Sequence, residues 1–233
     1  MKTMIVIGII AVLVVVVYSA FMHKYKQETD KMTPSETQEI TSGIYAIKTN
    51  YVNFYLIHDD GGYIAVDAGE NREIAAEQME TVGIRPEDVK MVLLTHTHND
   101  HIAALKLFEN AVVYSPEHEK QIHPQHKVIK DSEKVHGENV EIECICTPGH
   151  TPGSVSYLIN GSNLFVGDTL SLINGEVQLF NTFFNKNSDQ QKESVSKLAQ
   201  LDGIEYVFTS HYGYTNDFSY AFKQWEELQE KGN

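Results

Sequence analysis

The sequence predicts an α/β fold in which two β-sheets pack face to face and helices cover their outer faces. Runs of β-branched and aromatic residues alternate along the chain with segments whose apolar residues recur at helical spacing. The strand-like runs outnumber the helical segments, and turn-forming residues separate them. With 233 residues, 42% of them hydrophobic, the chain can fill a substantial core. Many strands with helices outside them indicate this layered arrangement.

The first element is an apolar, uncharged segment from Met4 to Met22. As a helix it would be about 28 Å long, close to the thickness of the hydrocarbon core of a bilayer. A cleaved signal peptide is the competing interpretation, but Tyr18 two positions before Ala20 makes a poor cleavage site. We therefore expect residues 1–23 to form an uncleaved, single-pass membrane anchor with the folded domain outside the cytoplasm. Cleavage would instead give a secreted protein.

Residues 24–42 are polar and charged without apolar periodicity, which is typical of a solvated stalk. The folded domain is expected to cover residues 43–233. Its expected strands are short apolar runs between turn residues, at positions 44–49, 52–59, 62–69, 89–96, 111–115, 140–147, 154–160, 163–168 and 205–210. Its expected helices repeat apolar residues at helical spacing, at positions 71–83, 100–110, 188–201 and 216–231. The histidine-rich run 116–137 is interpreted as a solvated helix and loop.

The charge balance limits the kind of partner. A formal net charge of −14, from 32 acidic and 18 basic residues, gives no basic footprint for nucleic acid, so we expect no nucleic-acid partner. The two cysteines, Cys144 and Cys146, are separated by one residue in an expected strand, where a disulfide rarely has acceptable geometry. They are interpreted as small core-facing side chains. The sequence leaves the oligomeric state open.

Three histidines and an aspartate follow the expected strand at 89–96 in the pattern H-x-H-x-D-H. An extended segment sends alternate side chains the same way, so His96 and His98 can share one metal ion. Asp100 and His101 lie where the chain turns into a helix and can face a second ion. Chance would give this pattern in about one of a thousand such sequences, so we interpret it as a metal-binding motif.

Three further ligand-type residues stand at the ends of other expected strands. They are His150 in TPGHTPGS, Asp168 in FVGDT and His211 in TSHYG. Because the ends of strands at one edge of a sheet converge in space, we expect these side chains to join the histidine motif.

These residues, in this order, resemble the metallo-β-lactamase superfamily of metallo-hydrolases from about Gly43 to the C-terminus. Four blocks carry the resemblance: VDAG at 66–69, THTHNDH at 95–101, TPGHTPGS with FVGDT at 147–154 and 165–169, and SH at 210–211. The resemblance implies an αββα sandwich with two metal ions per chain. The ions are usually zinc, with iron or manganese as alternatives.

The resemblance also implies a role for each ligand-type residue. It assigns the first metal ion to His96, His98 and His150, the second to Asp100, His101 and His211, and a bridging position between both to Asp168. Asp67 in VDAG would orient ligands without binding a metal ion.

The chemistry of these groups is consistent with that assignment. Neutral imidazole and carboxylate groups suit zinc, and a metal pair bridged by hydroxide supplies a nucleophile near neutral pH. Asp100 and Asp168 are therefore catalytic candidates as well as ligands. Tyr212 is a third candidate, because a phenol beside His211 could protonate a leaving group. Packing is the competing interpretation for Tyr212.

At some positions this chain differs from individual subfamilies, and these differences exclude some substrate classes. Class B β-lactamases of the common type have cysteine where this chain has Asp168, so the resemblance is closer to glyoxalase-II-like and lactonase-like members. Ser171 stands where quorum-sensing lactonases carry a catalytic tyrosine. We expect a zinc-dependent hydrolase that cleaves a small-molecule ester, thioester or lactone by a metal-bridging hydroxide. The alternatives are a phosphodiesterase of the same fold and a non-catalytic metal-binding module.

Overall fold

The computed structural model describes residues 2–122 and 125–231. The chain divides into two compact units, Met1–Met32 and Thr33–Asn233. The first unit is built on one long helix, α1 (Lys2–Thr29). No proline occurs before Pro34, so nothing in the sequence breaks this helix. It continues into the segment predicted to be a stalk, where Lys26 and Asp30 form an ion pair at 2.8 Å.

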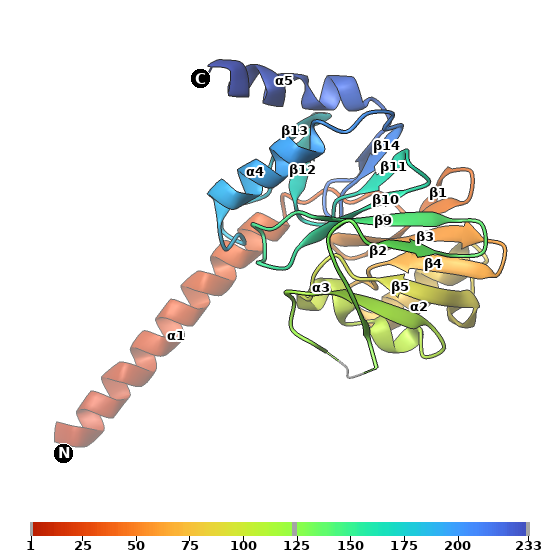
Figure 1. The fold of residues 1–233 in the computed structure, drawn as a ribbon. Helices are drawn as coiled ribbons and strands as arrows, with labels where there is room; N and C mark the ends of the chain where they lie inside the picture. Colours follow the sequence, from red (N-terminus) through yellow and green to blue (C-terminus); the bar gives the residue numbers. More distant parts are fainter. Residues whose placement is uncertain (1, 123–124, 232–233) are drawn as a thin grey trace. The chain divides into compact units, whose positions relative to one another are not determined.

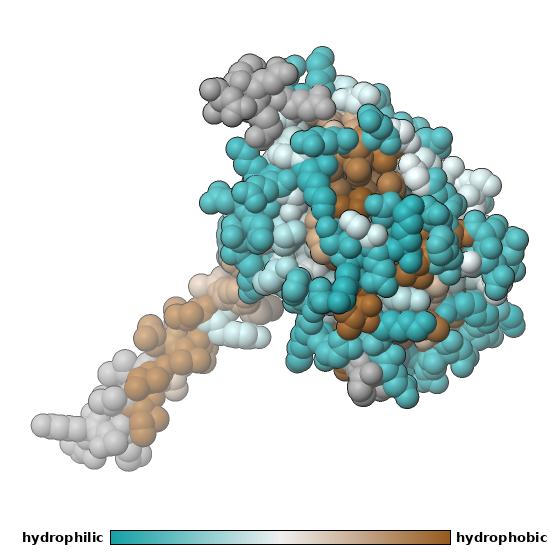
Figure 2. Space-filling model, viewed as in Figure 1, coloured by the Kyte–Doolittle hydropathy of each residue, from teal (hydrophilic) through white to brown (hydrophobic). Residues whose placement is uncertain are grey.

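The described side chains of α1 are mostly apolar and exposed. Those from Val12 to Val17 are 57–64% exposed, and Figure 2 shows them along the helix. Within the described residues, however, no helix combines the length and the hydropathy that a membrane crossing requires. The structure therefore gives no support to the predicted transmembrane anchor.

In the described residues of the second unit, seven strands form the first sheet, in the spatial order β1 to β7. Figure 1 labels β1 to β5 of this sheet. Its strands are β1 (Gln38–Thr41), β2 (Ile44–Thr49), β3 (Val52–Asp59), β4 (Gly62–Val66), β5 (Val89–Leu93), β6 (Val112–Pro116) and β7 (Lys127–Ile129). Strands β1 to β4 pair antiparallel, whereas β4 to β7 pair parallel. Parallel strands bring their carboxyl ends to one edge, and β5 leads into the histidine motif there.

Six strands form the second sheet, in the order β15-β14-β11-β10-β9-β8. They are β8 (Lys134–His136), β9 (Glu141–Cys146), β10 (Val155–Ile159), β11 (Asn163–Phe165), β14 (Tyr206–Phe208) and β15 (Tyr214–Thr215). A separate hairpin pairs β12 (Leu170–Ile173) with β13 (Glu176–Leu179). Strands β11 and β14 run parallel, so the residues that follow them leave the sheet at the same edge.

The described residues of this unit form four helices and two short 3-10 turns. They are α2 (Arg72–Thr81), α3 (Asn99–Ile102), α4 (Ser188–Leu198), α5 (Phe218–Lys231), η1 (Pro86–Asp88) and η2 (Leu105–Leu107). Asn71 caps α2 by accepting a hydrogen bond from the backbone N–H of Ile74. Asn187 caps α4 in the same way through the N–H of Gln190.

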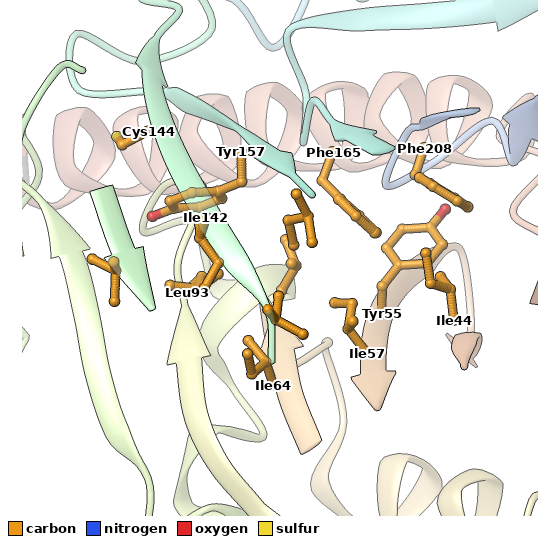
Figure 3. Packing of buried hydrophobic residues seen from close by; sticks show 14 of the residues in the cluster. Ile44, Tyr55, Ile57, Ile64, Leu93, Ile142, Cys144, Tyr157, Phe165 and Phe208 are labelled. Carbon is orange, nitrogen blue, oxygen red and sulfur yellow. The ribbon is translucent and has the colours of Figure 1, made fainter. Parts of the chain in front are cut away.

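The core consists of three apolar layers. One lies between the two sheets, where the ring of Tyr55 packs edge-on against Phe165 and Phe208 at centroid distances of 5.4 and 5.2 Å (Figure 3). A second joins the first sheet to α2, and a third joins the second sheet to α4 and α5. Helix, sheet, sheet and helix thus follow one another, which confirms the predicted α/β sandwich.

Two expected helices are corrected. The segment predicted as one helix over 100–110 forms only α3 and the turn η2, because the N–H of Ala104 turns to the carbonyl of Gly69 at 3.3 Å. The run 116–137 forms β7, β8 and turns in its described part, with no helix. The first sheet also begins with β1, ahead of the expected domain start at residue 43.

Candidate metal centre

Seven ligand-type side chains from both sheets meet at one place. They are His96 and His98 after β5, Asp100 and His101 in α3, His150 between β9 and β10, Asp168 after β11, and His211 after β14. The structure thus brings together every residue that the sequence analysis assigned to a metal ion. Of the seven, His96, His101, His150, Asp168 and His211 are buried.

The donor atoms of these side chains form three groups, within each of which all atoms lie within 4.8 Å of one another. The groups are His96 with His98 and His150, His96 with His101 and Asp168, and Asp100 with His101 and His211. The first and third groups match the two predicted ligand sets. Because His96 and His101 each belong to two groups, the donors form one continuous cluster.

Asp168 presents its two carboxylate oxygens to different histidines. Oδ2 lies 3.3 Å from Nε2 of His150 and 3.8 Å from Nε2 of His96. Oδ1 lies 3.3 Å from Nε2 of His211 and 3.5 Å from Nε2 of His101. One carboxylate therefore faces both predicted ligand sets, as a bridging ligand must.

Several donor atoms lack the hydrogen bonds that buried polar atoms normally make. Nε2 of His96, Nε2 of His101 and Oδ1 of Asp168 are buried and have no hydrogen-bond partner among the described residues. Imidazole nitrogen and carboxylate oxygen are ordinary zinc ligands. The residues present therefore fit divalent metal binding.

Asp67 lies behind the cluster and fixes the orientation of two ligands. Its Oδ2 accepts a hydrogen bond from Nδ1 of His101 at 2.8 Å, which leaves Nε2 of that ring directed into the cluster. The same carboxylate accepts hydrogen bonds from the N–H and the hydroxyl of Thr95, both at 2.8 Å. The Thr95 hydroxyl in turn lies 3.1 Å from Nδ1 of His96.

Two other histidines are held by groups that the sequence analysis did not identify. Nδ1 of His211 donates to the backbone carbonyl of Tyr51 at 2.7 Å. Nδ1 of His150 lies 3.2 Å from Oδ1 of Asn185, whose amide also donates to Oε1 of the buried Gln191. Both histidines thus point Nε2 toward Asp168.

The charges in the cluster divide its histidines into two kinds. Burial lowers the pKa of His150 to about 4, so its ring is neutral at pH 7. Burial also acts to lower the pKa of His211, but the nearby Asp168 and Asp100 carboxylates outweigh it and raise that pKa to about 9. Despite burial, the charges of His101 and His211 hold the pKa of Asp100 at about 2. Without metal, the second ligand set therefore retains a proton.

The sequence also matches a known protein family. The profile of the metallo-beta-lactamase superfamily matches residues 47–211, a range that includes all seven ligand-type residues. The chain belongs to the metallo-β-lactamase superfamily. The family predicted from the four sequence blocks is therefore confirmed.

Curated relatives in the superfamily are hydrolases. The hydroxyacylglutathione hydrolase of Erwinia tasmaniensis is 30% identical over 188 residues, which are 78% of this chain and 70% of the relative. The hydroxyacylglutathione hydrolase of Bartonella henselae is 35% identical over 164 residues, 67% of this chain and 61% of the relative. The chain thus spans between three fifths and seven tenths of these relatives. They confirm the predicted class, a hydrolase of the metallo-β-lactamase superfamily.

Solved structures agree on the fold. A metallo-beta-lactamase family protein from Thermus thermophilus superposes with a TM-score of 0.64 at 20% identity, covering 83% of this chain and 81% of its own. A subclass B3 metallo-beta-lactamase with an active-site glutamic acid superposes with a TM-score of 0.65 at 17% identity, covering 88% and 93%. At this identity the likeness concerns the superfamily fold alone.

Tyr212 directly follows His211, the last of the predicted ligands in the sequence. Its ring packs against other side chains. It meets Phe180 at a centroid distance of 6.1 Å and packs against the core layer beneath α4 and α5. Phe180 also packs against the rings of His150 and His211, at 5.0 and 5.6 Å. This position favours packing, and a catalytic role for Tyr212 stays a prediction.

Sequence reasoning missed the groups that hold the histidines from outside. Asn185 and Gln191 stand in a polar run, NKNSDQQ, in which nothing distinguishes a buried amide from an exposed one. Tyr51 contributes a backbone carbonyl, which any residue could supply. Only the folded superfamily scaffold brings these groups to the ligands.

Proposed function

We propose that this chain is a dinuclear, zinc-dependent hydrolase that cleaves a small ester, thioester or lactone. The single observation that carries the proposal is the arrangement around Asp168, whose two oxygens face the two histidine sets. Seven buried or half-buried donors would be more than one ion needs. Zinc ions bound there would supply an activated water molecule near neutral pH and would polarise the oxygen under attack.

The chain's own residues prepare the centre for this chemistry. Asp67 accepts a hydrogen bond from Nδ1 of His101, and the carbonyl of Tyr51 accepts one from Nδ1 of His211, so that both rings offer Nε2. Asp100 has a pKa of about 2 and is ionised at neutral pH, so it can bind a metal ion as a carboxylate. Asp168 faces His150 and His211 with its two oxygens. These features support both residues as ligands, and their catalytic roles stay predictions.

The substrate class is supported by the relatives. By their names they hydrolyse hydroxyacylglutathione, which is a thioester. A panel of thioesters, lactones, aryl phosphodiesters and a chromogenic β-lactam, assayed with the full chain, tests the class. We expect turnover of a thioester or lactone. Turnover of phosphodiesters alone would favour the phosphodiesterase alternative, and no turnover by protein that holds both metal ions would favour the binding module.

Metal content is measured on the same preparation. Protein purified without added metal should contain two equivalents of zinc by elemental analysis. A folded, fully active protein with at most one equivalent would contradict the dinuclear mechanism. Iron in place of zinc would exclude the zinc assignment.

The extracytoplasmic location stays a prediction. It rests on the apolar segment Met4 to Met22 of the sequence, since no described helix has the length and hydropathy of a membrane span. Cell fractionation and protease digestion of intact cells test it. The folded unit should sediment with membranes and be digested without lysis; protection until the membrane is broken would overturn the orientation.

A further inference from the structure

Glu119 lies three residues beyond β6 and joins two of the loops that carry ligands. Its Oε2 accepts hydrogen bonds from the backbone N–H of Thr97 at 3.0 Å and from the hydroxyl of Thr97 at 2.5 Å. Its Oε1 accepts a hydrogen bond from the hydroxyl of Thr151 at 2.5 Å. Each oxygen of this carboxylate therefore holds a different loop.

The two threonines flank all three histidines of one donor group. Thr97 stands between His96 and His98, and Thr151 directly follows His150. Neither Thr97 nor Thr151 is itself a predicted metal ligand. A carboxylate that fixes both of them fixes the distance between the two loops, and with it the spacing of the three imidazoles.

The close approach of the Glu119 segment to the second loop is built into the backbone. A β-carbon at Gly153 would lie 2.6 Å from the carbonyl carbon of His118 and 2.7 Å from the backbone nitrogen of Glu119. Real β-carbons do not approach other atoms so closely, so only glycine allows this contact. The loop is further fixed by Ser154, whose Oγ accepts a hydrogen bond from the N–H of Thr151 at 3.0 Å.

We propose that Glu119 is a positioning residue of the three-histidine metal site and acts through Thr97 and Thr151. Hydrogen bonds to an ionised carboxylate are short and strong, and partners behind metal ligands commonly determine affinity. The hydrogen bonds that this carboxylate accepts come from the two threonines, so its influence reaches the imidazoles through the backbone of their loops. The inference rests on the proposed metal-dependent function.

The test measures zinc binding to the full chain in the absence of substrate. Zinc-free protein is titrated with zinc in competition with a chromogenic chelator, which gives the affinity for each equivalent. We expect Glu119→Ala to weaken one of the two equivalents by about 10–100-fold and to change the other much less. Affinity as in the unmodified protein for both equivalents would overturn the proposal. An unmodified protein that binds no zinc would instead overturn the proposed function.

Conservative and matched variants separate positioning from charge and from folding. Glu119→Gln keeps an oxygen for Thr97 and an amide N–H that can donate to the Thr151 hydroxyl, so it should restore most of the affinity. A loss equal to that of Glu119→Ala would attribute the effect to charge and overturn the proposal. Glu117→Ala removes a carboxylate two residues away that pairs with Lys130, and it should leave both affinities unchanged. Circular dichroism of the zinc-free variants monitors the fold.

A double-mutant cycle tests the link itself and remains informative if Glu119→Ala folds poorly. Thr151→Val removes one hydroxyl with little change of shape, and it should weaken the same equivalent as Glu119→Ala. If the two residues act through one hydrogen bond, the effect of Thr151→Val should shrink in the Glu119→Gln background relative to the unmodified chain, because part of the link is already lost. Equal effects of Thr151→Val in both backgrounds would overturn the link.

Discussion

Asp168 is the residue on which both ligand sets depend, because each of its carboxylate oxygens faces a different set. Asp168→Asn leaves one oxygen, removes the charge and turns an amide N–H₂ toward histidine nitrogens. We expect kcat to fall by about a hundredfold or more and the zinc content to fall below two equivalents. Steady-state kinetics and elemental analysis measure both.

Loss of fold must be separated from loss of chemistry in this variant. Circular dichroism should match that of the unmodified chain, and Asp189→Asn on the exposed side of α4 serves as a control for the same chemical change. An Asp168→Asn protein with intact structure, both metal ions and near-full turnover would remove Asp168 from the mechanism.

Tyr212 allows a simpler test. Because its ring packs against Phe180, we expect Tyr212→Phe, which keeps the ring, to leave kcat nearly unchanged. A fall of about tenfold to a hundredfold would show that the phenol donates a proton to the leaving group. The ratio of kcat between the two proteins at several pH values decides between these roles.

We expect His211 to make metal binding depend on pH. Its pKa of about 9 means that, below this pH, the ring holds a proton that must leave before Nε2 can bind a metal ion. We expect the affinity for zinc to rise with pH and to level above about pH 9, with at least one proton released per chain at pH 7. Calorimetric titration in buffers of different ionisation enthalpy counts these protons. Zero release at pH 7 would contradict the assignment.

At the scale of elements, α4 supports the centre from behind. Gln191 on its first turns is fully buried, and its amide donates to the backbone carbonyl of Asp168 and to Oδ1 of Asn185, both at 3.1 Å. Gln191→Ala would leave these groups buried without partners, so we expect a loss of about 1–3 kcal/mol in the free energy of unfolding. Urea denaturation measures the loss.

The neighbouring residue provides the control for this helix. Gln190→Ala changes the same kind of side chain one position earlier, where it is only half-buried, and should change stability by less than about 0.5 kcal/mol. Equal losses for both variants would show that the effect comes from the helix as a whole and not from the contact with Asp168.

Most elements of the folded unit could be predicted because their signals are local. The strands β2 and β3 are short runs rich in aliphatic and aromatic residues, and the helix α4 buries residues at helical spacing. The segment 100–110 also has helical periodicity, but a contact with Gly69, distant in the sequence, ends the helix early. The short strands β12 and β13 pair mainly with each other, and no pattern in the chain distinguishes them from a loop.

In the candidate site, too, local sequence signals could be interpreted and distant contacts could not. Its seven ligand-type residues stand in compact motifs or at strand ends, so the sequence was enough to propose them. Glu119, Asn185 and Tyr51 act through contacts with residues 22 to 160 positions away. Such contacts depend on the packing of loops from different strands, and no spacing in the sequence encodes them.

At the scale of the whole molecule, the candidate ligands come from both sheets of the sandwich. Metal bound between them would stabilise the folded state over the unfolded state, in which the donors are dispersed. At zinc concentrations about a thousand times the dissociation constant, this is worth about 4 kcal/mol. We therefore expect removal of zinc by a chelator to lower Tm by about 10 °C, and added zinc to restore it. Differential scanning calorimetry measures the shift, and no change in Tm would contradict a metal shared between the sheets.

The donor residues are far apart in the sequence, so the ribosome adds them to the chain at different times. The three donor groups need His150, Asp168 and His211 respectively, whereas His96 and His101 are synthesised well before them. A ribosome-bound chain that already displays the histidine motif therefore holds only a fragment of each group. The full set of predicted ligands is present only after residue 211 has been translated. A product truncated before residue 211 would lack the last group, however much zinc the cell supplied.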